Sequence, residues 1–161
     1  MTKKKILIVD DMQSVRTALR QYLCPPVGAD VMLRQLLEKG TMDPTPAFDI
    51  SEANQGELGV QMAREALESG RPYDIIFMDM MMPPGIAGDA AIRKIREFDI
   101  DVGIIVCTAL TASTVQELTS ANGGTTPIVI SKPITAHSNL LAIVEKAVRG
   151  TQAANRNQGV A

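Results

Sequence analysis

The sequence of 161 residues lacks tryptophan and has only five aromatic residues, two Tyr and three Phe. Its core must therefore be aliphatic, with nine methionines available to fill irregular gaps. It has a single histidine and two cysteines, Cys24 and Cys107, which lie far apart and form no CxxC pair. This pattern argues against a disulfide framework or a zinc site, and it is typical of a reduced, cytoplasmic protein.

The sequence also has no excess of positive charge, because it contains 16 Lys and Arg residues and 18 Asp and Glu residues, and its pI is near 5.4. Proteins that hold a nucleic-acid backbone usually carry a basic field, so we expect no direct nucleic-acid binding. The apolar run Ile6–Val9 stops at Asp10 and Asp11. It is too short for a signal peptide or a membrane span, and we expect no membrane insertion.

The length fits one domain, since domains average about 150 residues. We expect this domain to cover residues 1–150 and to be followed by a flexible tail over residues 151–161, which are polar and aperiodic. A second catalytic or output domain has no room, so the sequence predicts a stand-alone protein.

Short apolar runs alternate with helical patterns along the chain. Four runs have the length and β-branched content of strands buried on both faces: Ile6–Val9, Ile75–Met78, Ile104–Cys107 and Ile128–Ile130. A fifth stretch, Phe48–Ala53, alternates apolar and polar residues, as expected of a strand at a sheet edge. Helical spacing follows each strand: Ser14–Leu23, Glu57–Ser69, Gly88–Phe98, Ala112–Ala121 and Ala136–Val148.

This alternation predicts an α/β protein with a doubly wound parallel sheet and helices on both faces. The edge position of the second strand favours the flavodoxin-like (βα)5 fold with strand order 2-1-3-4-5. The segment over residues 24–47 exceeds what a βαβ unit of roughly 30 residues needs. We interpret it as a helical insertion between the first helix and the second strand, placed near the amino ends of the strands.

Acidic residues follow two of the predicted strands. Asp10 and Asp11 come after the first strand and Asp79 after the third, and strand order reverses between these two strands. Ligands of open α/β sheets bind outside the carboxyl ends of the strands at this point, so the three carboxylates should share a pocket. A cluster of oxygen ligands that repel one another suits Mg²⁺ or Mn²⁺ better than zinc.

Two further polar side chains should reach the same pocket. The fourth strand leads to Thr108, which offers a hydroxyl, and the fifth leads to Lys132, which offers a positive charge. Singly, each residue has a plainer explanation as a turn former, a helix cap or a solvated lysine. Together they form an apparatus for phosphorylating an aspartate, in which Asp79 attacks in line while metal and Lys132 neutralise phosphoryl oxygens.

The motifs ILIVDD, FMDMMMP, CTA and SKP resemble the receiver domain of bacterial two-component response regulators, over roughly residues 4–149. The resemblance implies that Asp79 is the phosphoacceptor, that Asp10 and Asp11 bind metal, and that the Met81 carbonyl is a further metal ligand. It also implies a sensor histidine kinase or phosphotransfer protein as phosphoryl donor, and a downstream protein whose identity the sequence does not give.

By the same resemblance Thr108 is the switch hydroxyl and Lys132 is the phosphate-binding lysine, joined to Pro133 by a cis peptide bond. The chain departs from the family pattern three positions before the lysine. Many receivers carry an aromatic residue there, whereas this chain has Val129. The loop Met82–Gly88 is one residue longer than usual, with Ala87 where Asp is common.

Hydrolysis of the phosphorylated state needs a positioned water. By resemblance, Met81 and Leu110 flank the path of this water, and neither side chain can hold it. The sequence therefore predicts slow self-dephosphorylation.

Two other function classes are open. A phosphorylation-independent scaffold could use the same fold, although loss of an acid or of the lysine would be its mark and none is lost. A haloacid-dehalogenase-like phosphatase also forms an aspartyl phosphate, but it needs Asp-x-Asp where this chain has Asp10-Asp11-Met12. We expect no enzyme activity beyond Mg²⁺-dependent phosphorylation and dephosphorylation of the protein itself.

Overall fold

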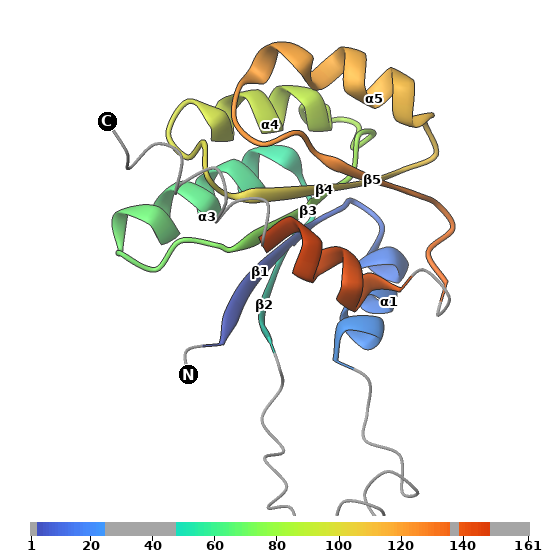
Figure 1. The fold of residues 1–161 in the computed structure, drawn as a ribbon, viewed down its shortest axis with the longest axis horizontal. Coiled ribbons are helices and arrows are strands. Elements are labelled where there is room, and N and C mark those ends of the chain that lie inside the picture. Colours follow the sequence, from blue (N-terminus) through green and yellow to red (C-terminus); the bar gives the residue numbers. More distant parts are fainter. Residues whose placement is uncertain (1–2, 25–47, 136–138, 149–161) are drawn as a thin grey trace, which may run out of the picture.

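A computed structural model describes residues 3–24, 48–135 and 139–148 of the chain. Five parallel strands form one sheet in the order β2-β1-β3-β4-β5, which confirms the predicted flavodoxin-like fold (Figure 1). The elements in chain order are β1 (Lys4–Val9), α1 (Gln13–Leu23), β2 (Phe48–Ala53), α3 (Gly56–Glu68), β3 (Ile75–Met78), α4 (Gly88–Arg96), β4 (Gly103–Thr108), α5 (Ala112–Thr119), a 3-10 turn (Ser120–Asn122) and β5 (Ile128–Ser131). Residues 140–148 are also helical.

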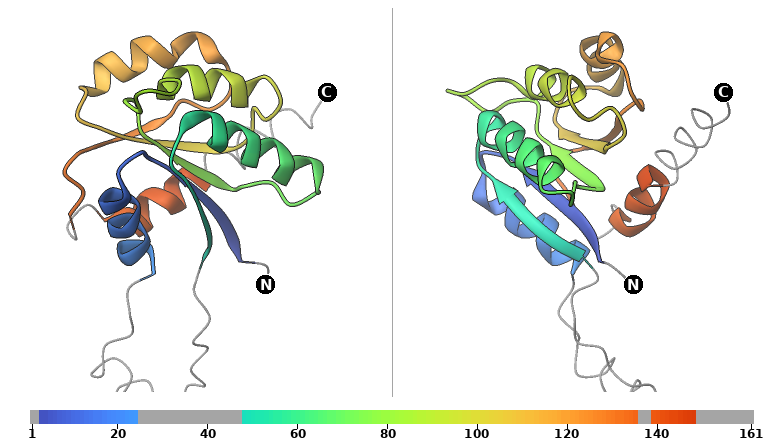
Figure 2. Two further views of the ribbon diagram at one scale, coloured as in Figure 1. Left: turned by 180° about the vertical axis from the view of Figure 1, so that it is seen from behind. Right: turned by 90° about the vertical axis from the view of Figure 1, so that its left-hand side faces the viewer.

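Helices cover both faces of the sheet (Figures 1 and 2). Successive strand residues point to opposite faces, so Leu7 and Val9 pack with α3, α4 and α5, whereas Ile6 and Ile8 pack with α1 and the helix over residues 140–148. The central strands β1, β3 and β4 are buried on both sides, as their continuous apolar runs predict. The outcome is a rigid aliphatic support beneath the loops that follow the strands.

The predicted helix Ala136–Val148 is helical over residues 140–148 of its described part. Asn139 has a φ of 48°, in the left-handed region that asparagine tolerates better than most residues, and helical structure starts at residue 140. The predicted start at Ala136 falls outside the described residues. So do the predicted tail and, apart from Cys24, the predicted helical insertion.

Arg96, the last residue of α4, is 5% exposed. Its guanidinium donates hydrogen bonds to the carbonyl oxygens of Ile100 and Val102, each at 2.9 Å, and of Thr125 at 3.0 Å. Burial lowers the pKa of Arg96, although nearby carboxylates oppose the shift. Arg96 thus connects the end of α4 to the residues just before β4 and to the loop before β5 through hydrogen bonds.

Helices that could cross a membrane are absent from the described ranges, because none there is both long enough and apolar enough.

Candidate functional site

The hydrogen-bond ladder of the sheet fixes the two acids that directly follow β1 and β3. The backbone N–H of Asp10 donates to the Ala53 carbonyl at 3.1 Å, and that of Asp79 donates to the Val9 carbonyl at 2.9 Å. Each acid therefore continues its strand by one ladder bond, and the parallel pairing of Val9 with Met78 brings both to the same edge of the sheet.

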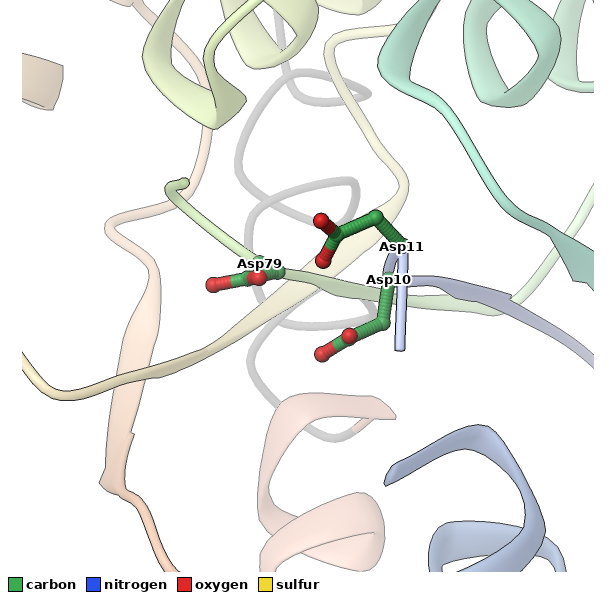
Figure 3. A group of neighbouring side chains, drawn as sticks. All are labelled: Asp10, Asp11 and Asp79. Atoms are coloured by element: carbon green, nitrogen blue, oxygen red, sulfur yellow. The ribbon is translucent and has the colours of Figure 1, made fainter. Parts of the chain in front are cut away.

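The three acids form one cluster at this edge (Figure 3). Carboxylate oxygens of Asp10, Asp11 and Asp79 all lie within 4.8 Å of one another. Asp10 and Asp79 are buried at 1% and 5% exposure, whereas Asp11 is half-buried. Three carboxylates with one open side supply the hard oxygen donors that Mg²⁺ prefers, and they leave room for water in its coordination shell. The residues thus fit the predicted metal.

Lys132 reaches this cluster from the far side of β4. Its backbone N–H donates to the Thr108 carbonyl at 2.9 Å, which extends the pairing of β4 with β5. Its Nζ lies 2.7 Å from Asp10 Oδ2 and 3.2 Å from Asp79 Oδ2. The peptide bond from Lys132 to Pro133 is cis, as the resemblance implies. The structure thus joins an ammonium group to both buried acids.

The charges at the cluster shift the pKa of two groups. Burial and the negative charge of Asp10 raise the pKa of Asp79, and the nearby Lys132 ammonium opposes this shift only in part. Burial lowers the pKa of Lys132, but the hydrogen bond and charge of Asp10, with the contribution of Asp79, outweigh burial and raise it. Lys132 therefore remains a cation at neutral pH, and extra positive charge at the pocket would favour the nucleophilic, ionised form of Asp79.

Thr108 ends β4 with a buried side chain, which is 1% exposed. Its Oγ1 accepts a hydrogen bond from the Leu110 N–H at 3.2 Å, and a hydroxyl that accepts one bond can still donate its own proton. The plainer explanation of Thr108 as a helix cap does not hold, because Thr111 caps α5 by accepting from the Thr114 N–H. The Thr108 hydroxyl thus lies at the carboxyl end of β4, and Lys132 directly follows the carboxyl end of the neighbouring strand β5.

The residues after Asp79 alternate between core and surface. Met80 and Met82 are 2% and 1% exposed, whereas Met81 between them is 63% exposed. The Met81 N–H donates to Asp79 Oδ1 at 3.3 Å, so the backbone here lies against the carboxylate. The backbone of Gly88 packs directly against that of Asp79, since a side chain at position 88 would collide with the Asp79 carbonyl oxygen.

Two functional-site contacts lie beyond what the sequence pattern indicates. Arg16 on α1 donates to the Asp10 carbonyl at 2.8 Å, and it also pairs with Glu52 on β2. Glu57, at the start of α3, accepts a hydrogen bond from the Ile86 N–H in the loop after β3 at 2.9 Å. Both contacts depend on how α1 and the loop pack against distant elements, and no local motif marks them.

Comparison with known families gives a match to the response regulator receiver domain over residues 27–145. This range includes Asp79, Thr108 and Lys132. Asp10 and Asp11 precede it, and the pairing of β1 with β3 is what brings them beside Asp79.

Several curated proteins are similar in sequence. The two-component response regulator ORR41 of Oryza sativa subsp. japonica is 30% identical over 63% of this chain and 62% of its own length. The chemotaxis protein CheY of Halobacterium salinarum is 32% identical over 66% of this chain and 68% of its own length. The response regulator GacA of Pseudomonas aeruginosa is 31% identical over 65% of this chain, which corresponds to 37% of GacA.

Solved structures support the fold. A CheY-like receiver domain from Methanospirillum hungatei JF-1 aligns with a TM-score of 0.65 at 17% identity, over 94% of this chain and 99% of its own. The N-terminal domain of a response regulator from Carboxydothermus hydrogenoformans aligns with a TM-score of 0.63 at 24% identity, over 94% and 98%.

Proposed function

This chain belongs to the receiver domain family of response regulators in two-component signalling, and we propose that Asp79 accepts a phosphoryl group from a phosphohistidine. The donor is a sensor histidine kinase or a histidine phosphotransfer protein, and phosphorylation changes the affinity for a downstream protein. The observation that carries this proposal is the position of Lys132 Nζ, within 3.2 Å of Asp79 and 2.7 Å of Asp10.

The proposed reaction is an in-line displacement at phosphorus. An ionised Asp79 oxygen forms the new P–O bond while the P–N bond to the donor imidazole breaks, and the imidazole leaves with the electron pair of that bond. The Lys132 ammonium, now held by two carboxylates, moves to a phosphoryl oxygen and balances its charge. The Thr108 hydroxyl donates a hydrogen bond to another phosphoryl oxygen.

Asp10, Asp11 and Asp79, together with the Met81 carbonyl, would hold Mg²⁺ in this account. When bound there, Mg²⁺ neutralises negative charge that develops on the transferred group. Because three carboxylates crowd the pocket, the protein's own residues place the nucleophile and the lysine but leave an excess of negative charge. We therefore propose that phosphorylation requires a divalent cation, and that catalysis by this protein is limited to its own phosphorylation and dephosphorylation.

The experiment uses intact-mass spectrometry after incubation with acetyl phosphate. The wild type with Mg²⁺ should gain the mass of one phosphoryl group, and it should gain none in EDTA. Asp79→Asn should gain none under either condition. Transfer that proceeds unchanged in EDTA would show that the acidic cluster does not serve the reaction, and equal phosphorylation of Asp79→Asn would move the site elsewhere.

A further inference from the structure

The loop between β3 and α4 carries Asp79 and Met81 into the pocket, but α4 begins without a side-chain cap. Its N-cap residue is Ala87, which has no side-chain acceptor for the free N–H groups of the first turn. The loop must therefore be held in place by other contacts.

Glu57, in the first turn of α3, provides such a contact. Its Oε1 accepts a hydrogen bond from the Ile86 N–H, the residue before the N-cap, at 2.9 Å. The same carboxylate lies against Gly85, where an added Cβ would stand 3.2 Å from Glu57 Cδ and closer still to Oε2. The Cβ would also meet Gln55 Oε1, so a side chain at Gly85 would require the Gln55 and Glu57 side chains to move.

The backbone of α3 is equally close to this part of the loop. A Cβ at Gly56, the first residue of α3, would lie 2.8 Å from Ile86 Cγ1 and 3.0 Å from the Ile86 carbonyl oxygen. The side chain of Ile86 in turn packs against the core between the sheet and α3, α4 and α5. Ile86 is thus held by its side chain, by close packing on α3 and by one carboxylate hydrogen bond.

The other end of the loop touches the reacting group. Met80 and Met82 are buried in the same core, and Gly88 N–H donates to the Met80 carbonyl at 3.1 Å. Between these fixed points the Met81 N–H contacts Asp79 Oδ1. The Gly85 N–H donates to the Met82 carbonyl at 3.1 Å, so a shift of Gly85 and Ile86 acts on Met82, the residue next to Met81.

From this arrangement we infer that Glu57 is a positioning residue for phosphorylation of Asp79. Resting on the proposed function, Glu57 anchors the residue that precedes the uncapped start of α4, because it accepts from the Ile86 N–H. By holding Ile86, it keeps the Met81 backbone where the acidic cluster can bind Mg²⁺. Loss of the contact should weaken metal binding and slow phosphorylation together, because both need the same backbone position.

Three variants separate the hydrogen bond from the charge. Glu57→Ala removes both, whereas Glu57→Gln keeps an acceptor oxygen and removes only the charge. Glu68→Ala, an exposed change at the end of the same helix, is the matched control. For each protein we would measure the thermal midpoint, Mg²⁺ affinity by calorimetry, and the Mg²⁺ dependence of phosphorylation by acetyl phosphate.

We expect Glu57→Ala to weaken Mg²⁺ binding about 10-fold, the lower end for groups that orient metal ligands, and to raise the Mg²⁺ concentration for half-maximal phosphorylation to match. Glu57→Gln should stay within about two-fold of the wild type because its amide oxygen still accepts from Ile86. Glu68→Ala should match the wild type, and all thermal midpoints should be similar.

Two results would overturn the inference. Equal Mg²⁺ affinity in Glu57→Ala and Glu68→Ala would show that the contact does not position the loop. Equal losses in Glu57→Ala and Glu57→Gln would show that charge, and not the hydrogen bond, matters. Failure of the proposed function looks different, since the wild type would then gain no phosphoryl group on Asp79 while calorimetry still reports the effect of Glu57.

Discussion

Lys132 Nζ lies 3.2 Å from Oδ2 of Asp79, the proposed phosphoacceptor. The same nitrogen is 2.7 Å from Asp10 Oδ2, so the lysine is held between two acids and is 18% exposed in its side chain. In the proposed reaction the ammonium group leaves these carboxylates to pair with a phosphoryl oxygen.

Replacing Lys132 tests the role of this charge. Lys132→Met should lower the rate of phosphorylation by acetyl phosphate at least about 100-fold, the effect typical of losing one charge-stabilising donor. Lys132→Arg should not restore the rate, because its planar guanidinium does not act as a compact point charge. Lys94→Met, an exposed change on α4, is the control. A wild-type rate in Lys132→Met would contradict the assignment.

Asp79 should lower the stability of the metal-free protein. Burial and Asp10 raise its pKa, so the folded state binds a proton more readily than the unfolded chain does, and the stability that this provides is lost as pH rises through the folded pKa. Asp79→Asn should therefore melt at a higher temperature than the wild type in EDTA at neutral pH.

The difference should shrink at acidic pH, because the raised pKa of the wild-type carboxyl lets it take up a proton there. Thermal melts followed by circular dichroism at the two pH values measure it. A lower melting temperature for Asp79→Asn at neutral pH would mean that the ion pair with Lys132 outweighs both burial and repulsion by Asp10.

The lifetime of the phosphorylated state should depend on Met81, which is 63% exposed beside the acceptor. Met81→Asn supplies a hydrogen-bonding group that can orient an attacking water, and it should shorten the lifetime about 3- to 10-fold. Decay is followed by intact mass after removal of acetyl phosphate. Leu118→Asn, at an exposed apolar position on α5, should leave decay unchanged. An unaltered lifetime in Met81→Asn would show that water access does not limit hydrolysis.

Residues 25–47 should be dispensable for phosphorylation. The residues that flank this segment lie at the end of the sheet remote from the acids, since Phe48 pairs with Lys4 at the start of β1 while Asp10 follows its end. A variant in which a Gly/Ser linker joins Cys24 to Phe48 should be phosphorylated within about two-fold of the wild-type rate, because Asp10, Asp11, Asp79 and Lys132 all lie outside the deleted segment. A large loss of rate would refute the placement of the segment.

The positions of the acids could be predicted from sequence because the strands are short apolar runs that end abruptly. Val9 and Met78 are the last apolar residues before Asp10 and Asp79, and a parallel sheet brings such ends to one edge. Lys132 follows the same rule on β5. Its proximity to Asp10 needed only the strand order, which the alternating edge strand Phe48–Ala53 indicated.

Contacts made by loops could not be predicted in the same way. The hydrogen bond from Ile86 to Glu57 joins positions 29 residues apart and depends on a loop without regular spacing. The carbonyl partners of Arg96 likewise arise from turns around Ile100 and Thr125, where backbone direction and not residue type decides which oxygens face the guanidinium. The left-handed backbone of Asn139 likewise falls within a periodic pattern that predicts regular helix.

The most direct test of the account identifies the phosphorylated atom itself. The wild type would be incubated with acetyl phosphate and Mg²⁺ and then treated with borohydride, which reduces an aspartyl phosphate to homoserine, before peptide mass mapping. We expect homoserine at position 79 and nowhere else, with Asp10 and Asp11 recovered intact. Reduction at another acid, or unmodified Asp79 in protein that carries a phosphoryl group, would contradict the central claim.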